Sequence, residues 1–172
     1  PSFSSKVLIY KGLLLAEQID EFYPELKEND IKSAIALVHQ RYSTNTFPSW
    51  DLAQPFRFLA HNGEINTIKG NVNWMTARDP ELFNDILLKE EIAKLFPITN
   101  NYDSDSCNLD HAFELLVASG KSIAETAMIL VPEPWEKNNL LDNKIRKYYE
   151  YNSGLMEPWD GPAAIAFTDG VQ

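Results

Sequence analysis

Hydrophobic and polar positions follow two different periods along the chain, and together they predict a mixture of strands and helices. Short apolar runs bounded by turn residues predict four strands, at residues 7–10, 33–41, 57–61 and 163–168. The run Ser33–Arg41 contains five consecutive apolar residues, a pattern typical of a central strand buried on both faces.

Apolar residues spaced three and four apart predict helices in much of the remaining chain. Because most of these helices follow the third strand rather than alternating with strands, the predicted fold class is α+β. Residues 42–55 are rich in Ser, Thr, Asn, Asp and Pro and predict a loop. The predicted helices cover residues 13–22, 66–78 and 108–119, a segment that begins at the capping box of Ser122 and Glu125, and a segment that follows Pro134.

Composition limits the class of protein. A chain of 172 residues that is 44% hydrophobic can bury one ordinary core. Its formal charge of −10 argues against nucleic acid as a partner, and its apolar runs are too short for a membrane span. The N-terminus does not resemble a secretory signal. With a single cysteine the chain is expected in a reducing compartment, the cytoplasm, or a plastid in a photosynthetic eukaryote.

The two ends of the sequence resemble cuts within a domain. A strand is predicted almost at the first residue, and the turn pair Asp169-Gly170 follows the last strand without a further strand to pair with it. We therefore expect residues 1–172 to form one partial domain, truncated at both ends.

Arg41 stands where the second predicted strand ends and the polar loop begins. Loops fed by strand ends often hold ligands, and a guanidinium can donate two parallel hydrogen bonds to a carboxylate. Arg41 is therefore a candidate ligand for an anionic group. The alternative is an ordinary ion pair with a neighbouring acidic residue.

Asn62 and Gly63 follow the third predicted strand. A side-chain amide and a backbone N–H next to a glycine can converge on one oxygen, as an oxyanion hole requires. The alternative is a tight turn of type I′, for which Asn-Gly is a strong signal.

Asp105 lies in a polar stretch, residues 100–108, just before a predicted helix. Its carboxylate can cap that helix, or it can face a cleft and accept hydrogen bonds from an ammonium group. Cys107 and His111 share one helical face and could form a thiol–base pair, but a small buried cysteine is the favoured interpretation. The His and Cys spacing predicts no metal site, and Pro1 is read as a boundary rather than a catalytic amine.

Six ordered segments resemble the class II, N-terminal-nucleophile glutamine amidotransferase domain of glutamate synthase large subunits. The resemblance runs from about residue 4 to residue 170. The matching segments are His39–Trp50, Gln54–Arg57, Leu59–Thr67, Gly70–Trp74, Ser104–Ser106 and Leu155–Ala163.

The resemblance implies an αββα sandwich with antiparallel sheets, in which a cysteine at the mature N-terminus attacks the side-chain amide of L-glutamine. Glutamate and ammonia result, and the ammonia is used to aminate 2-oxoglutarate reductively. By the same resemblance Arg41 binds the α-carboxylate of glutamine, Asp105 binds its α-ammonium, and Asn62 with Gly63 forms the oxyanion hole. Thr44 and Asn45 lie in the matching substrate loop.

The sequence departs from the family at its first residue, which is Pro1 rather than cysteine. The nucleophile would then precede this chain, and the isolated chain is expected to be inactive. No cofactor is expected within it, whereas FMN and an iron–sulfur cluster are implied for the complete enzyme, with its other domains and a small subunit or ferredoxin as partners. Two alternatives stay open: a non-catalytic glutamine-binding or scaffold domain, and an unrelated hydrolase that uses Asp103 or Asp105 as its base.

Overall fold

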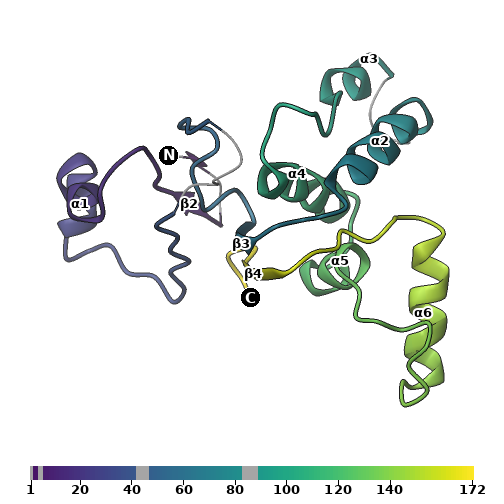
Figure 1. Ribbon diagram of the computed structural model, residues 1–172. Helices are drawn as coiled ribbons and strands as arrows, with labels where there is room; N and C mark the ends of the chain where they lie inside the picture. Colours follow the sequence, from purple (N-terminus) through teal and green to yellow (C-terminus); the bar gives the residue numbers. More distant parts are fainter. Residues whose placement is uncertain (1, 4–5, 42–46, 83–88) are drawn as a thin grey trace. The chain divides into compact units, whose positions relative to one another are not determined.

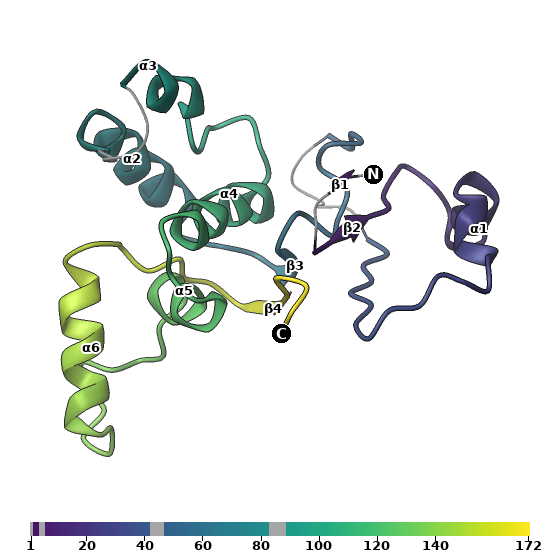
Figure 2. The same ribbon diagram turned by 180° about the vertical axis from the view of Figure 1, so that it is seen from behind.

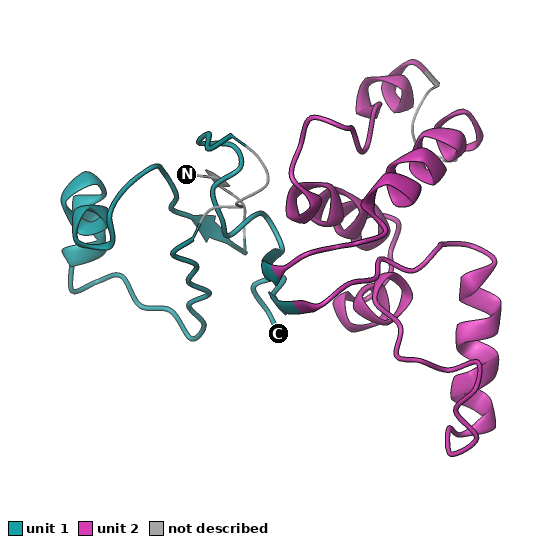
Figure 3. Ribbon diagram, viewed as in Figure 1, with its two compact units in different colours: residues 1–62, 164–172 teal, residues 63–163 magenta. Residues whose placement is uncertain are grey.

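The computed structural model describes residues 2–3, 6–41, 47–82 and 89–172. The chain forms two compact units (Figure 3). Unit 1 comprises Pro1–Asn62 with Ala164–Gln172, and unit 2 comprises Gly63–Ala163. Helices and strands are both present, which confirms the α+β class.

Unit 1 is built from short elements. Strands β1 (Ser2–Phe3) and β2 (Leu8–Ile9) pair antiparallel, with Ser2 opposite Ile9. The predicted helix at 13–22 is confirmed as the short helices η1 (Ala16–Gln18) and α1 (Ile19–Phe22), followed by η2 (Pro24–Lys27) (Figure 1). The buried apolar residues of unit 1 are Ile9, Tyr23, Leu52, Ala53, Phe56, Leu59 and Ala60.

The central strand predicted at Ser33–Arg41 is wrong. This segment, all of which the structure describes, forms no strand. Its apolar residues are exposed apart from the half-buried Leu37, with exposed fractions of 47% at Ile35 and 79% at Val38. The hydrogen bonds of Ser33 with Ile35 are local. An apolar run makes burial favourable, but it does not identify a neighbouring strand. Without a neighbouring strand its backbone groups cannot form the hydrogen bonds of a sheet.

The second sheet joins strand β3 (Leu59–Gly63) to strand β4 (Ala163–Phe167). The Thr168 N–H donates to the Phe58 carbonyl at one end, and the Glu64 N–H donates to the Pro162 carbonyl at the other, so the two strands run antiparallel. Both strands were predicted within two residues of their bounds. The described part of the predicted loop, residues 47–55, contains neither helix nor strand.

Unit 2 is mainly helical, as predicted. The helix predicted at 108–119 begins three residues earlier. Helix α5 contacts both α4 and α6 and lies between them in the two opposite views (Figures 1 and 2). The helices are α2 (Ile68–Arg78), η3 (Asp79–Glu81), α3 (Lys89–Ile92), η4 (Ala93–Leu95), α4 (Asp105–Ala118), α5 (Ile123–Leu130) and α6 (Asn143–Ser153).

Local sequence sets the ends of these helices. The Ser122 hydroxyl accepts a hydrogen bond from the Glu125 N–H and caps α5, which confirms the predicted cap. After α4, Gly120 has a φ of 98°, and the Gly120 and Lys121 N–H groups donate back to the carbonyls of Val117 and Leu116. This pair of bonds is the Schellman motif that a glycine after the helix end permits.

Two backbone segments of unit 2 approach each other closely, residues 64–67 and residues 158–162. The Thr67 N–H donates to the Asp160 carbonyl, and the Asp160 N–H donates to the Thr67 hydroxyl at 2.9 Å. The amide of the buried Asn71 donates to the Pro158 carbonyl at 3.0 Å. A Cβ at Gly161 would overlap the Glu64 carbonyl oxygen, so this approach requires glycine.

We predict that Gly161→Ala lowers the free energy of unfolding by about 1–3 kcal/mol, because the added methyl must displace backbone rather than a mobile side chain. Gly70→Ala is the matched control. Gly70 lies within α2 with open space around its Cα, so alanine should raise stability by up to about 1 kcal/mol. Denaturant unfolding of both variants tests this, and equal effects would contradict it.

Candidate functional site

The candidate site residues are divided between the two units. Arg41 and Asn62 belong to unit 1, whereas Gly63 and Asp105 belong to unit 2. Thr44 and Asn45 lie outside the described residues. The convergence of Arg41, Asn62, Gly63 and Asp105 on one ligand therefore stays a prediction, and each part is described by itself below.

Asn62, in β3, is held by a histidine that sequence reasoning did not single out. The His39 Nε2 lies 2.8 Å from the Asn62 Oδ1, and the His39 Nδ1 accepts a hydrogen bond from the Arg41 N–H at 3.3 Å. With Nδ1 as an acceptor, the neutral ring carries its proton on Nε2 and donates it to Asn62. Because Oδ1 takes this bond, the NH₂ group of Asn62 is directed away from the ring.

Gln54 fixes the backbone next to Asn62. Its Oε1 accepts from the His61 N–H at 2.7 Å, and its Nε2 donates to the His61 carbonyl at 3.1 Å. One side chain thus satisfies both backbone groups of a strand residue, as a neighbouring strand would. The two residues are seven apart, with irregular chain before the start of β3, so the pairing has no periodic signal in the sequence.

Gly63 adopts a backbone conformation that few other residues tolerate. Its φ is +118°, and a Cβ at this position would overlap the Pro162 carbonyl oxygen. Asn62 does not have positive φ, and β3 pairs with the distant β4. The predicted Asn-Gly tight turn is therefore wrong, since a type I′ turn needs positive φ at both residues.

Asp105 is the first residue of α4, but it is not the residue that caps the helix. The Ser104 hydroxyl caps it by accepting from the Cys107 N–H at 3.1 Å. The Asp105 Oδ2 accepts from the Ile65 N–H at 2.9 Å, and its Oδ1 accepts from the Ser106 N–H at 2.7 Å. Asp105 therefore ties the start of α4 to the segment directly after Gly63.

Cys107 and His111 share one face of α4, as their spacing predicts. The Cys107 Sγ lies 3.7 Å from the His111 Nε2, and Cys107 is buried. The structure adds Asp103 to this pair, a residue considered above only as a possible catalytic base. Asp103 lies before the start of α4, so the helical period gave no signal for it.

No helix among the described residues has both the length and the apolar character that crossing a membrane would require.

Comparison with known proteins assigns the chain to a family. The sequence profile of class-II glutamine amidotransferases matches residues 1–172. The chain belongs to the class-II glutamine amidotransferase family.

Among individual proteins, the chain is similar to glutamate synthases with different electron donors. It is 53% identical over 171 residues to the glutamate synthase [NADPH] large chain of Bacillus subtilis, covering 99% of this chain and 11% of that protein. It is 50% identical to ferredoxin-dependent glutamate synthase 2 of Synechocystis, over 98% of this chain and 11% of that protein. It is 48% identical to the glutamate synthase [NADH] of Saccharomyces cerevisiae, over 98% of this chain and 8% of that protein. The chain thus spans about one tenth of the length of these relatives.

Proposed function

We propose that this chain binds L-glutamine and supplies the oxyanion hole for its hydrolysis to glutamate and ammonia, as part of a glutamate synthase. The observation that carries the proposal is the hydrogen bond from His39 to Asn62, which directs the Asn62 NH₂ group away from His39 next to Gly63 with its positive φ. An amide N–H and a backbone N–H at adjacent residues are suitable donors to the oxygen of a tetrahedral intermediate. Membership of the amidotransferase family supports this use of the pair.

Glutamine recognition is assigned to Arg41 and Asp105. A free amino acid requires a cation for its α-carboxylate and an anion for its α-ammonium, and these two residues supply one of each. The support for Asp105 is its placement, because its carboxylate is bonded to the Ile65 N–H, two residues from Gly63. Thr44 and Asn45 are proposed as further contacts from the loop that follows Arg41.

The nucleophile is proposed to lie outside these 172 residues. The single cysteine, Cys107, is buried and lies beside His111 on the helix that begins at Asp105. A one-cysteine chain also does not fit an iron–sulfur cluster, which takes several cysteine thiolates. Any iron–sulfur cluster would therefore be bound elsewhere in a complete enzyme, and FMN is proposed to bind there as well.

The electron donor is not assigned. Relatives whose names specify NADPH, NADH and ferredoxin are similar to this chain to nearly the same degree, at 53%, 48% and 50% identity. This similarity is expected if the chain carries out the glutamine step, which all three would share. The other domains of the synthase, and a small subunit or ferredoxin, are the proposed partners.

Arg41→Lys should raise the KM for glutamine by about tenfold or more, since a point charge does not reproduce two parallel hydrogen bonds to a carboxylate. Steady-state ammonia release by the complete polypeptide that carries this chain measures the effect. Arg146→Lys is the matched control, because Arg146 donates to the Trp135 and Glu136 carbonyls instead. A KM that responds equally to both substitutions would contradict the assignment.

Asn62→Ala should lower kcat on the order of 10²-fold with a much smaller change in KM, because the lost donor acts on the transition state. His39→Ala should lower kcat less, and the double variant should be no slower than Asn62→Ala, since His39 acts through Asn62. His39→Gln retains an N–H donor and should recover part of the loss. Additive effects of the two single substitutions would exclude a positioning role for His39.

The 172-residue chain alone should release ammonia from glutamine no faster than buffer, because Cys107 is not the nucleophile. Coupled assay of ammonia decides this. Turnover that disappears in Cys107→Ser would make Cys107 the nucleophile. Turnover that disappears in Asp103→Asn would instead favour an unrelated hydrolase with a carboxylate base.

A further inference from the structure

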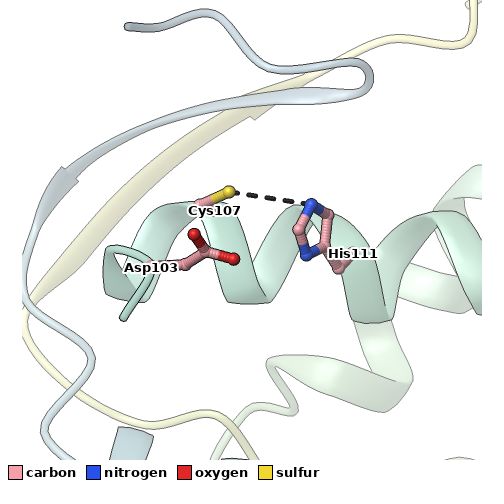
Figure 4. Close-up of side chains that lie close together, drawn as sticks. All are labelled: Asp103, Cys107 and His111. Atoms are coloured by element: carbon pink, nitrogen blue, oxygen red, sulfur yellow. Dashed lines mark hydrogen bonds between the residues drawn. The ribbon is translucent and has the colours of Figure 1, made fainter. Parts of the chain in front are cut away.

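Three side chains with different metal-binding chemistry meet on one side of α4 in unit 2. They are the carboxylate of Asp103, the thiol of Cys107 and the imidazole of His111, and one ligand atom from each lies within 4.8 Å of the others. Figure 4 shows the three side chains directed toward one another, with the contact of Cys107 and His111 marked. None of these residues is used in the proposed glutamine chemistry.

Two different features bring the three residues together. Cys107 and His111 lie four residues apart within α4 and so share one face of the helix. Asp103 precedes the capping residue Ser104 and is not helical, so its position comes from the turn before α4.

Asp103 is held in position by a second set of hydrogen bonds. Asn100 donates from its amide to the Asp103 carboxylate and accepts from the Asp103 N–H at 2.9 Å. Asn100 is itself held by the buried Asn108, whose Oδ1 accepts from the Asn100 N–H at 2.8 Å and whose Nδ2 donates to the Asn100 carbonyl at 2.9 Å. Outer hydrogen bonds of this kind orient the ligands of protein metal sites.

We propose that Asp103, Cys107 and His111 form a binding site for a divalent transition-metal ion, for which Zn²⁺ is the best match. Zinc accepts thiolate, imidazole and carboxylate ligands together, whereas Mg²⁺ and Ca²⁺ select oxygen ligands. With Zn–S and Zn–N bonds of about 2.3 and 2.0 Å, a tetrahedral ion separates sulfur from nitrogen by about 3.5 Å. The observed distance from the Cys107 Sγ to the His111 Nε2 is 3.7 Å.

Charge and burial agree with this assignment. A carboxylate and a thiolate carry two negative charges, which one divalent cation neutralises while the imidazole binds as a neutral ligand. Cys107 is only 7% exposed, and Asp103 and His111 are half-buried, so the thiolate would be costly without a cation beside it. Three protein ligands leave the fourth tetrahedral position for water, as in exchangeable zinc sites.

The sequence had predicted no metal site, because one cysteine and three histidines show no ligand-like spacing. The contribution of Asp103 became visible only in the structure. The alternative is that the Cys107 thiol only donates a weak hydrogen bond to His111. In that case the three residues should bind no metal ion in a defined geometry.

Titration of the chelator-treated 172-residue chain with Co²⁺ tests the proposal without any variant. Binding of one ion per chain, with strong visible absorption of tetrahedral cobalt and a near-ultraviolet band from a thiolate–cobalt bond, is the expected result. Zn²⁺ should then displace the cobalt. Cobalt binding without the thiolate band, or no binding by a chain whose helical circular dichroism is intact, would overturn the proposal.

Variants identify the ligands. Cys107→Ser should abolish the thiolate band, and Asp103→Asn and His111→Gln should each weaken Zn²⁺ binding by about tenfold or more. Glu150→Gln is the matched control for Asp103→Asn, since it removes an exposed carboxylate of α6 in the same unit. If Glu150→Gln weakens binding as much as Asp103→Asn does, the ion is held by general negative charge and the proposal fails.

Discussion

The approach of two backbone segments in unit 2, residues 63–67 and 158–163, is the constraint on which the candidate oxyanion geometry depends. Both Gly63 and Gly161 lie where a Cβ would overlap a carbonyl oxygen of the opposite segment. Because glycine has no side chain, the two main chains can approach at these positions. Asn71 then donates to the Pro158 carbonyl and Thr67 accepts from the Asp160 N–H, so these backbone groups are not buried without partners. Gly63 is therefore fixed from both sides, by the end of β3 and by the opposite segment.

Asp105 and His39 extend this constraint to the groups proposed to act on glutamine. Asp105 accepts from the backbone two residues beyond Gly63, and His39 orients the side chain of the residue before it. A preorganised donor costs no reorganisation when charge develops on the substrate, and this is the physical basis of oxyanion stabilisation. The same few hydrogen bonds thus serve stability and the proposed chemistry.

Sequence patterns predicted the helices well, because the 3.6-residue period and the caps at Ser122 and Gly120 are local signals. They failed at Ser33–Arg41, where an apolar run predicted a buried strand and the structure has an exposed segment. They also failed at Asn62-Gly63, where a local turn preference lost to pairing with a strand about one hundred residues away. Residue chemistry left Arg41 and Asp105 open between ligand binding and an ion pair or a helix cap, and motif resemblance decided between them. The contacts of Gln54 with His61 and of His39 with Asn62 follow no helical or strand period, so the sequence pattern did not reveal them.

Residues at the start of α4 make contacts with different parts of the protein. Ser104 caps the helix, Asp105 bonds to Ile65, and Cys107 faces Asp103 and His111 on another side. Successive helical residues point about 100° apart, so neighbours in the sequence serve separate surroundings. Few substitutions in this segment should be tolerated during evolution. Each of these residues makes its own contact, so a neighbouring residue cannot take over a contact that a substitution removes. An inserted or deleted residue here would rotate all of these groups out of place at once.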